Sequence, residues 1–263
     1  MPPKDKADCY FCQIRIYNNV MRLSVIIPAY NEEKRILSTL GSVSLYLQKQ
    51  PYDYEIIVVN DGSSDRTASV VESLKSKVQS LRIIDKEKNQ GKARAVQAGI
   101  LAAQGVLRLF MDADNSTKIE NLDKMIPYIN EGYDVVIASI GTSGAKVAGA
   151  EPFYKRLLGK LGNLWIRLCV LPGVKDTQRG FKLFTAQAVE KIFPEMRTSG
   201  WGFDVELLAL ARRFSYKIKE VPIEWRNPPG SKVSLWSYPK VFFQVLKIRW
   251  NLRTGKYGNY ISN

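Results

Sequence analysis

Short apolar segments that suit buried strands alternate with segments of helical periodicity through the first half of the chain. The helical spacing is clear at Ile36, Leu40, Val43 and Leu47. Continuous apolar strands are typical of a sheet that is covered on both faces. The order therefore predicts an α/β fold with a doubly wound, mainly parallel sheet flanked by helices. The strand-like segments are residues 23–28, 55–60, 81–84, 106–111 and 134–140.

The second half of the chain has longer helical segments and two segments expected to be loops. Residues 141–149 are rich in Gly, Ala and Ser, and residues 176–182 are polar with one glycine. No internal repeat or linker is evident. We therefore expect a loose tail over residues 1–20, one α/β domain over residues 21–235, and a basic amphipathic helical extension over residues 236–263. Helical patterns cover residues 151–171, 203–214 and 239–253, and residues 216–225 are expected to be extended.

The composition restricts the chemistry. The formal net charge of +14 favours anionic partners, and the absence of histidine excludes Ser-His-Asp and Cys-His mechanisms as well as histidine-containing zinc sites. Cys9 and Cys12 form a lone CxxC, which fits reduced thiols and leaves a metal or redox role open. There is no run of 18 apolar residues, so no transmembrane helix is expected, and the N-terminus lacks the pattern of a secretory signal.

Two carboxylates, Asp112 and Asp114, follow the strand-like segment 106–111 directly. Two like charges so close together repel each other unless a cation neutralises them. Mg²⁺ or Mn²⁺ takes oxygen ligands and leaves coordination positions for substrate phosphates. The pair is therefore a candidate metal site for a bound diphosphate, and the alternative is a solvated acidic turn.

Polar residues also follow the other expected strands. Asp61 has the chemistry to accept N–H bonds from a nucleobase, or to cap the next helix. Tyr30 is placed to flank that base, and Asn31 to cap the helix after it. Lys92 follows a glycine at an expected helix start, which favours an anion, although a solvated surface lysine fits as well. Residues 117–120 match a capping box.

Seven motifs follow one another in a recognisable order. PAYNEE, VVNDGSSD, NQGKARAVQAG and DADNSTK together resemble the inverting family-2 glycosyltransferases of the GT-A fold. DTQRGFKLF, GWGFDVELL and VPIEWRNPPGSKVS resemble the polyprenyl-phosphate sugar synthases, above all dolichyl-phosphate β-glucosyltransferases, with dolichyl-phosphate mannose synthases close behind. The resemblance covers about residues 21–235 and implies a GT-A catalytic domain.

The resemblance also implies roles for individual residues. Asp112, Ala113 and Asp114 would bind ribose, diphosphate and the Mg²⁺ or Mn²⁺ ion, with the two aspartates as metal ligands. Arg179 and Lys182 would act in catalysis by facing the acceptor or donor phosphates. Residues expected to bind the nucleotide sugar are Pro28, Ala29, Tyr30, Glu32, Asp61, Lys92, Ser231 and Lys232.

Two positions depart from the mannose synthases. Ser116 stands where some of those enzymes have a metal-binding glutamine, and Pro228 and Pro229 precede Gly230 where an arginine is often found nearby. The DAD-x-x-TK and W-F-DVE patterns also resemble the glucosyl enzymes more closely, which favours UDP-glucose as the donor and leaves GDP-mannose as the alternative. The sequence does not indicate an oligomeric state.

The acceptor implied by the resemblance is a polyprenyl or dolichyl phosphate. A phosphate monoester is anionic near neutral pH, so it needs no general base. A family-2 enzyme that acts on a saccharide hydroxyl would need a general base, and Asp204 is the candidate. The alternative is that Asp204 and Glu206 orient a basic side chain or cap a helix. Nucleic acid is not an expected partner, because no recognised binding motif is present.

The acceptor also implies contact with a membrane, because its polyprenol tail stays in the bilayer. Residues 151–171 and 239–253 combine apolar faces with Lys and Arg, which suits docking on a membrane surface. The alternative is that both are core-facing helices with snorkelling lysines. The expected location is cytoplasmic, peripherally associated with the cytoplasmic face of a membrane.

Overall fold

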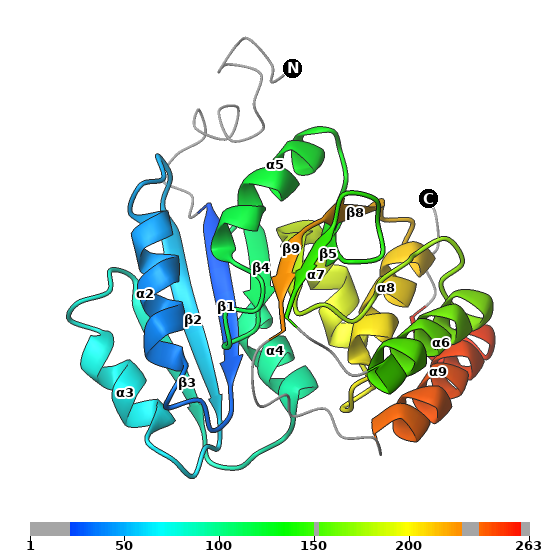
Figure 1. Ribbon diagram of the computed structural model, residues 1–263, viewed down its shortest axis with the longest axis horizontal. Helices are drawn as coiled ribbons and strands as arrows, with labels where there is room; N and C mark the ends of the chain where they lie inside the picture. The colour runs from blue at the N-terminus through cyan, green and yellow to red at the C-terminus, as the bar shows by residue number, and fades with distance from the viewer. Residues whose placement is uncertain (1–21, 150–152, 228–236, 259–263) are drawn as a thin grey trace.

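The computed structural model describes residues 22–149, 153–227 and 237–258 and has a seven-stranded sheet at its centre (Figure 1). The strand order is β3-β2-β1-β4-β7-β5-β8. Helices cover both faces, which confirms the predicted α/β, GT-A-like fold with a mixed, mostly parallel sheet. The strands are β1 Leu23–Ala29, β2 Tyr54–Asp61, β3 Leu81–Lys86, β4 Leu107–Met111, β5 Val135–Ser139, β7 Phe181–Thr185 and β8 Ile218–Pro222.

One strand of this sheet runs against the others. β1 pairs in parallel with β2 and β4, and β5 with β8, but β7 is antiparallel to both β4 and β5. Phe181 at the start of β7 is therefore paired with Met111 at the end of β4. As a result, the residues before β7 lie at the same edge of the sheet as the residues that follow β4.

Two layers of helices enclose the sheet. α2, α3 and α5 pack on the face that carries Val25 and Ile27, and α4, α7 and α8 pack on the face that carries Ile26. Alternate residues of one strand thus enter different cores, as the pleat requires. The helices are α2 Ile36–Leu47, α3 Thr67–Leu74, α4 Lys92–Leu101, α5 Leu122–Asn130, α6 Phe153–Cys169, α7 Ala186–Ile192, α8 Phe203–Arg213 and α9 Ser237–Arg253, with 3₁₀ turns η1 Ile119–Asn121 and η2 Phe193–Glu195.

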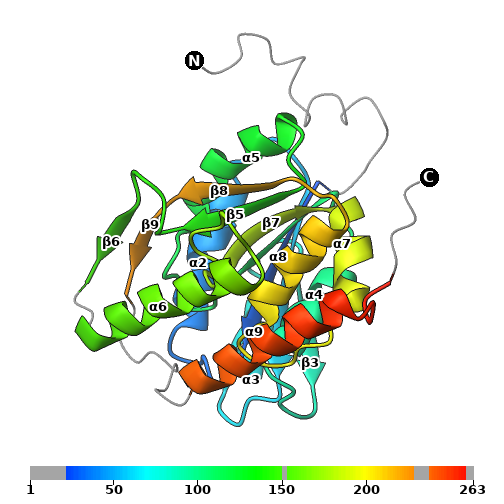
Figure 2. The ribbon, with the colours of Figure 1, turned by 90° about the vertical axis from the view of Figure 1, so that its right-hand side faces the viewer.

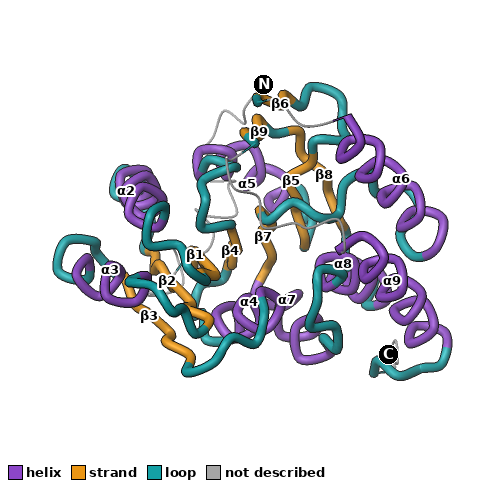
Figure 3. Tube along the Cα trace, turned by 60° about the horizontal axis from the view of Figure 1, so that its bottom comes forward, coloured by secondary structure: helices purple, strands orange, loops and turns teal. Residues whose placement is uncertain are grey.

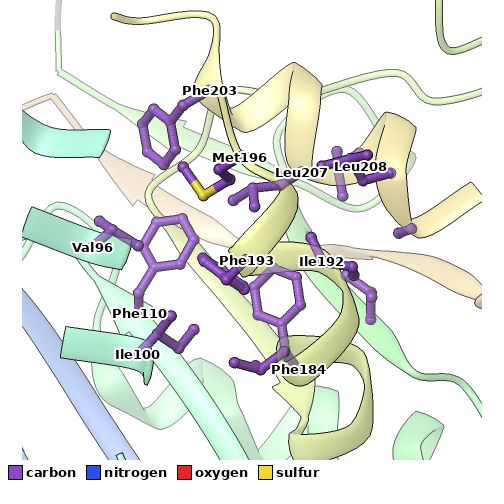
Figure 4. Packing of buried hydrophobic residues seen from close by; sticks show 14 of the residues in the cluster. Val96, Ile100, Phe110, Phe184, Ile192, Phe193, Met196, Phe203, Leu207 and Leu208 are labelled. Atoms are coloured by element: carbon purple, nitrogen blue, oxygen red, sulfur yellow. The ribbon is translucent and has the colours of Figure 1, made fainter. Parts of the chain in front are cut away.

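The second of these cores is rich in aromatic rings. Figure 4 shows side chains from α4, α7 and α8 pointing toward Phe110 of β4 and Phe184 of β7. Phe184 meets Phe193 edge to face, with 5.3 Å between centroids, and Phe110 lies 6.1 Å from Phe203. Such pairs add to the free energy gained from burial alone. Phe203 opens α8, so this packing fixes the start of α8 beside the end of β4.

α6 and α9 form an outer pair beyond α8 (Figure 2). The C-terminal helix that the sequence predicts is present as α9, and its Val245 and Ile248 are buried in the same core as α8. The division into a domain and a separate extension stays a prediction. None of the helices in the described ranges combines the length and apolar character needed to span a bilayer.

Several local expectations were wrong. Asn31 does not cap a helix: it has a φ of 53°, and α2 begins only at Ile36. The capping box at residues 117–120 is absent, because η1 and α5 begin without a side-chain cap. The expected loop at 176–182 leads into β7, and the expected loop at 141–149 contains β6 Lys146–Ala148, which pairs with β9 Glu224–Arg226.

Candidate active site

The candidate site lies at the edge of the sheet where β1, β2 and β4 end and β7 begins (Figure 3). Ligands of open α/β sheets bind beyond the carboxyl ends of the strands. Asp61 is the last residue of β2, and Asp112 follows β4 directly. Gly180 immediately precedes β7 and accepts a 3.0 Å hydrogen bond from the Asp112 N–H. The antiparallel strand thus joins two distant motifs at one point.

Asp112 is held between a glycine and a lysine. A Cβ atom at position 180 would lie 2.2 Å from Asp112 Oδ2, so only glycine allows the carboxylate to lie there. The Lys92 Nζ lies 2.5 Å from Asp112 Oδ1. Gly91, the N-cap of α4, has a φ of 91°, a conformation that glycine adopts readily. This backbone geometry brings Lys92 to the end of β4.

The pKa of Lys92 is raised. Burial alone would lower it, but the negative charges of Asp112, Asp204 and Asp114 together outweigh that effect. Lys92 is therefore a cation at neutral pH, at the start of a helix and beside two carboxylates. Its partner in the structure is Asp112, and the binding of a ligand anion by Lys92 stays a prediction.

Asp112 and Asp114 remain the predicted metal ligands, and their surroundings fit that prediction. Both side chains are partly exposed, and Asp114 Oδ1 accepts a 3.0 Å hydrogen bond from the Ser116 N–H. Between them, Ala113 is buried, and its carbonyl accepts the Thr39 hydroxyl at 2.7 Å. No third Asp, Glu or Cys joins the pair within the part of the chain that the structure describes. Two hard oxygen donors with free positions around the ion fit Mg²⁺ or Mn²⁺ bound to a diphosphate.

Asp61 is buried and holds the turn before α4. Lys86 Nζ lies 2.7 Å from its Oδ1, and the N–H of Gly91 donates to Oδ2 at 2.7 Å. The N–H of Gln90 is shared between both oxygens. A carboxylate has further acceptor positions, so a bond to a nucleobase would be an additional one. That role stays a prediction.

The residues after β1 are held by the start of α3. Pro28 and Ala29 are buried at the end of β1, whereas Tyr30 is 40% exposed. Glu32 is bonded twice to Arg35, at 2.6 and 2.8 Å, and its N–H donates to Thr67. Of the nucleotide-binding residues predicted in this segment, Tyr30 is therefore the one whose side chain is most open to a ligand.

Lys182 lies in a different environment from the one the sequence suggested. It is fully buried, and its Nζ lies 2.5 Å from Asp204 Oδ1 and 5.2 Å from the Phe110 ring centroid. Burial lowers the pKa of Lys182 and raises that of Asp204, and each charge counteracts the shift of the other. The expectation that Lys182 faces a phosphate is thus not met, since its ammonium is used in this buried ion pair.

Arg179 has the open position that Lys182 lacks. Its Nε donates to Asp176 Oδ2 at 3.0 Å, and its guanidinium lies 4.5 Å from the centroid of the Trp225 ring. Its two terminal nitrogens form no hydrogen bond with the described residues. Asp176 is itself buried and accepts the Ile140 N–H. Arg179 is therefore oriented by neighbours and still able to bind an anion.

Trp225 also connects β9 to the turn after Asp114. Thr117 forms a β-bridge with Trp225, and the Arg226 N–H donates to the Ser116 carbonyl at 2.9 Å. β9, the strand that precedes Ser231 and Lys232 in the sequence, therefore lies beside the turn after Asp114. Ser231 and Lys232 themselves lie outside the described residues.

A comparison with family models identifies the protein class. The model described as Glycosyl transferase family 2 matches residues 24–193, which hold all of the strand ends described above. The chain belongs to glycosyl transferase family 2. It is thus a glycosyltransferase of the hexosyltransferase kind, as its motifs predicted.

Several similar proteins share one name, dolichyl-phosphate beta-glucosyltransferase. A dolichyl-phosphate beta-glucosyltransferase of Trichomonas vaginalis is 37% identical over 241 residues, covering 88% of this chain and 71% of that protein. The dolichyl-phosphate beta-glucosyltransferase of Homo sapiens is 36% identical over 250 residues, covering 89% and 76%. The predicted resemblance to dolichyl-phosphate β-glucosyltransferases is confirmed.

A solved structure supports the fold. Glucosyl-3-phosphoglycerate synthase from Mycobacterium tuberculosis, in complex with Mn²⁺, uridine-diphosphate and glucosyl-3-phosphoglycerate, aligns with a TM-score of 0.66 at 20% identity. The match covers 92% of this chain and 82% of that one.

Glu206 has a structural role, within the alternatives that the sequence left open. Glu206 is fully buried and accepts the backbone N–H groups of Arg197 and Thr198 as well as the Tyr257 hydroxyl at 2.6 Å. It therefore serves the fold. Trp225 was not predicted, although a tryptophan beside an arginine, in VPIEWR, is a signal that could have been used. Cys9 and Cys12 lie outside the described residues.

Proposed function

We propose that this chain transfers glucose from UDP-glucose to a dolichyl or other polyprenyl phosphate, with inversion at the anomeric carbon. The observation that carries the proposal is the 36–37% identity, over nearly nine tenths of the chain, to proteins named dolichyl-phosphate beta-glucosyltransferase. The site chemistry agrees with it at three points: the metal donors, the free arginine and the lack of an available base.

Asp112 and Asp114 would hold Mg²⁺ or Mn²⁺ on the donor diphosphate. When bound, the ion neutralises charge on the departing nucleoside diphosphate. Lys92 supplies a further positive charge beside Asp112, at the N-terminus of α4. Preorganised charges of this kind stabilise the transition state where negative charge develops.

Arg179 would bind the acceptor phosphate. Its Nε is held by Asp176 and its face by Trp225, which leaves the terminal nitrogens for phosphate oxygens. A phosphate oxygen attacks the anomeric carbon while the bond from that carbon to the diphosphate oxygen breaks, and UDP leaves with the electron pair. The attack comes from the face opposite the leaving group, so the configuration inverts.

No general base is required, because a phosphate monoester is already anionic at neutral pH. Asp204, the carboxylate that could act as a base on a saccharide hydroxyl, is 3% exposed and paired with Lys182 at 2.5 Å. This pairing favours the phosphate acceptor over the hydroxyl acceptor. With such an acceptor, we place the protein peripherally on the cytoplasmic face of a membrane.

A donor and acceptor panel tests the proposal. UDP-glucose, UDP-N-acetylglucosamine and GDP-mannose are each incubated with a short-chain polyprenyl phosphate or with free glycans, in Mg²⁺, Mn²⁺ or EDTA. We expect transfer from UDP-glucose to the polyprenyl phosphate, which EDTA abolishes. Transfer from GDP-mannose would overturn the proposed donor, and transfer to a glycan hydroxyl would overturn the proposed acceptor.

Two variants accompany the panel. Asp114→Ala is expected to lose roughly 100-fold or more of kcat, as for removal of a group that stabilises transition-state charge. Asp53→Ala removes an exposed aspartate that precedes β2, away from the candidate site, and should be unchanged. Full turnover by Asp114→Ala would contradict its role as a metal ligand.

A further inference from the structure

α6 and α9, which are far apart in the sequence, lie side by side on the outside of the molecule. Figure 2 shows them running in the same direction across α8. The ring of Trp165 stacks on that of Phe242, with 4.4 Å between centroids, and Arg249 donates a hydrogen bond to the Cys169 carbonyl at the end of α6. The two helices therefore form one surface.

Each helix has an apolar side toward the core and a second apolar side toward solvent. Ile166, Val245 and Ile248 are buried, so the inner faces of the two helices already pack against the core. On the outer faces, Leu168, Phe243 and Trp250 are 70%, 67% and 63% exposed. A surface helix ordinarily places polar side chains there. The outer stripes are Leu157, Leu161, Leu164 and Leu168 on α6, and Phe243, Leu246 and Trp250 on α9.

The charge around these stripes has one sign. Neither α6 nor α9 contains an acidic residue. Their exposed cations form no ion pair within the part of the chain that the structure describes. Apolar stripes flanked by cations complement a bilayer with anionic headgroups. These exposed cations are Lys160, Arg167, Lys240, Lys247 and Arg253.

The surface is also tied to the candidate active site. Gln244 of α9 accepts the Gly202 N–H at 2.7 Å. Gly202 directly precedes α8, and the first turn of α8 carries Asp204, the partner of Lys182. Figure 3 places α6 and α9 along one side of the sheet edge where the site lies. Trp201, in the same turn as Gly202, is exposed as well.

We infer that the outer stripes of α6 and α9 form a single docking platform for an anionic lipid bilayer. Docking there brings the sheet edge with Asp112 and Arg179 beside the headgroup layer, where the phosphate of a polyprenyl phosphate lies. The inference rests on the proposed function for its purpose, although binding to a bilayer does not require transfer.

Vesicle flotation of the full chain tests this platform. The vesicles are phosphatidylcholine alone, or phosphatidylcholine with phosphatidylserine, and contain no acceptor. The double variant Leu161→Glu/Phe243→Glu should bind the mixed vesicles at least about tenfold more weakly than the wild type, because both apolar contacts are lost. Lys160→Glu and Lys247→Glu should each weaken binding about fivefold, and only to the anionic vesicles.

The matched control is Leu37→Glu/Leu45→Glu on α2. Both leucines are exposed, and α2 lies on the opposite side of the sheet from α6 and α9 (Figure 1). This variant should bind vesicles as the wild type does. Circular dichroism and thermal melting establish that both double variants are folded, as expected for substitutions of exposed side chains.

Two results would overturn the inference. One is equal binding of the platform variant and the α2 control. The other is a dimer in solution that Phe243→Glu dissociates, since a second copy would then cover the stripes. Activity with a water-soluble short-chain acceptor separates this inference from the proposed function. Vesicle binding that needs the platform, without any transfer, would reject the function and keep the platform.

Discussion

The guanidinium of Arg179 lies over the Trp225 ring, 4.5 Å from its centroid, while its Nε donates to Asp176. Arg179 precedes β7, and Trp225 belongs to β9, whose backbone bonds to the turn after Asp114. One aromatic side chain therefore contacts the arginine from a strand that adjoins the turn after the two aspartates predicted to bind metal. Trp225 is a positioning residue by this argument, since it acts through Arg179.

Substitution of Trp225 should weaken acceptor binding selectively. A cation–π contact contributes about 0.5–2 kcal/mol, so Trp225→Ala should raise the KM for the polyprenyl phosphate roughly 2- to 30-fold. Trp225→Phe keeps an aromatic face and should recover most of the loss. Steady-state kinetics with each substrate varied in turn measure the effect. An equal rise in the KM for the nucleotide sugar would argue for a general structural defect instead.

Gly180→Ala should displace the Asp112 carboxylate. The added Cβ would lie 2.2 Å from Asp112 Oδ2, so the side chain must move. We expect a loss of about 100-fold in kcat, as for the removal of an electrostatic group at the reacting centre. Gly159→Ala in α6 is the control, because nothing lies within 4 Å of its added Cβ. It should keep full activity and melt at the same or a higher temperature, as alanine favours helices.

Asp204→Asn should destabilise the fold. It leaves Lys182 buried without its counter-ion, which costs about 3–5 kcal/mol when one partner of a buried pair is removed. Urea denaturation measures the loss. The double variant Lys182→Met/Asp204→Leu should regain most of it, because an apolar pair needs no compensating charge. If Asp204 were a catalytic base instead, Asp204→Asn would lose turnover with unchanged stability.

Alkaline pH should destabilise the fold at Tyr52, which lies near the contact between α2 and α5. The Tyr46 hydroxyl donates to Asp123 Oδ1 at 2.5 Å, and burial above all raises the pKa of nearby Tyr52 to about 12. A raised pKa stabilises the protonated phenol in the folded state, so this stability is complete below pH 10 and is lost as the pH rises toward 12. Two pKa units correspond to about 2.7 kcal/mol at most.

Unfolding free energies measured between pH 8 and pH 12 check this expectation. Tyr52→Phe has no phenol to ionise at position 52, and its stability should fall less steeply in that range. Absorbance at 295 nm reports the ionisation directly. A midpoint for Tyr52 near pH 10 would contradict the expected shift.

The fold was predictable where apolar residues were continuous. β1, β2, β4 and β5 are buried along their whole length, and their segments are dominated by apolar residues, so they were easily found. β7 was missed because FKLFT directly follows the polar residues 176–180 and includes Lys182, and a lysine inside a buried strand is rare. Only the tertiary structure shows that Asp204, 22 residues later, compensates that charge.

The candidate site was predictable where its residues follow strands along the chain. Asp61, Asp112 and Asp114 lie at the predicted edge for that reason. The neighbours of a residue across the sheet were not predictable, because periodicity carries no information about pairing between distant segments. Gly180 beneath Asp112 and Trp225 beside Arg179 are both of this kind.

The reversed direction of β7 has a consequence for how the enzyme can be altered. The chain leaves the reaction edge after Asp114 and returns at Arg179, so the intervening excursion begins and ends at neighbouring points. Its inner part also starts and finishes at adjoining residues, since Gly141 lies beside Lys175, but Ile166, Leu171 and Val174 anchor it in the core. Chimeras that exchange this part among relatives should therefore fold only when these three apolar positions are kept.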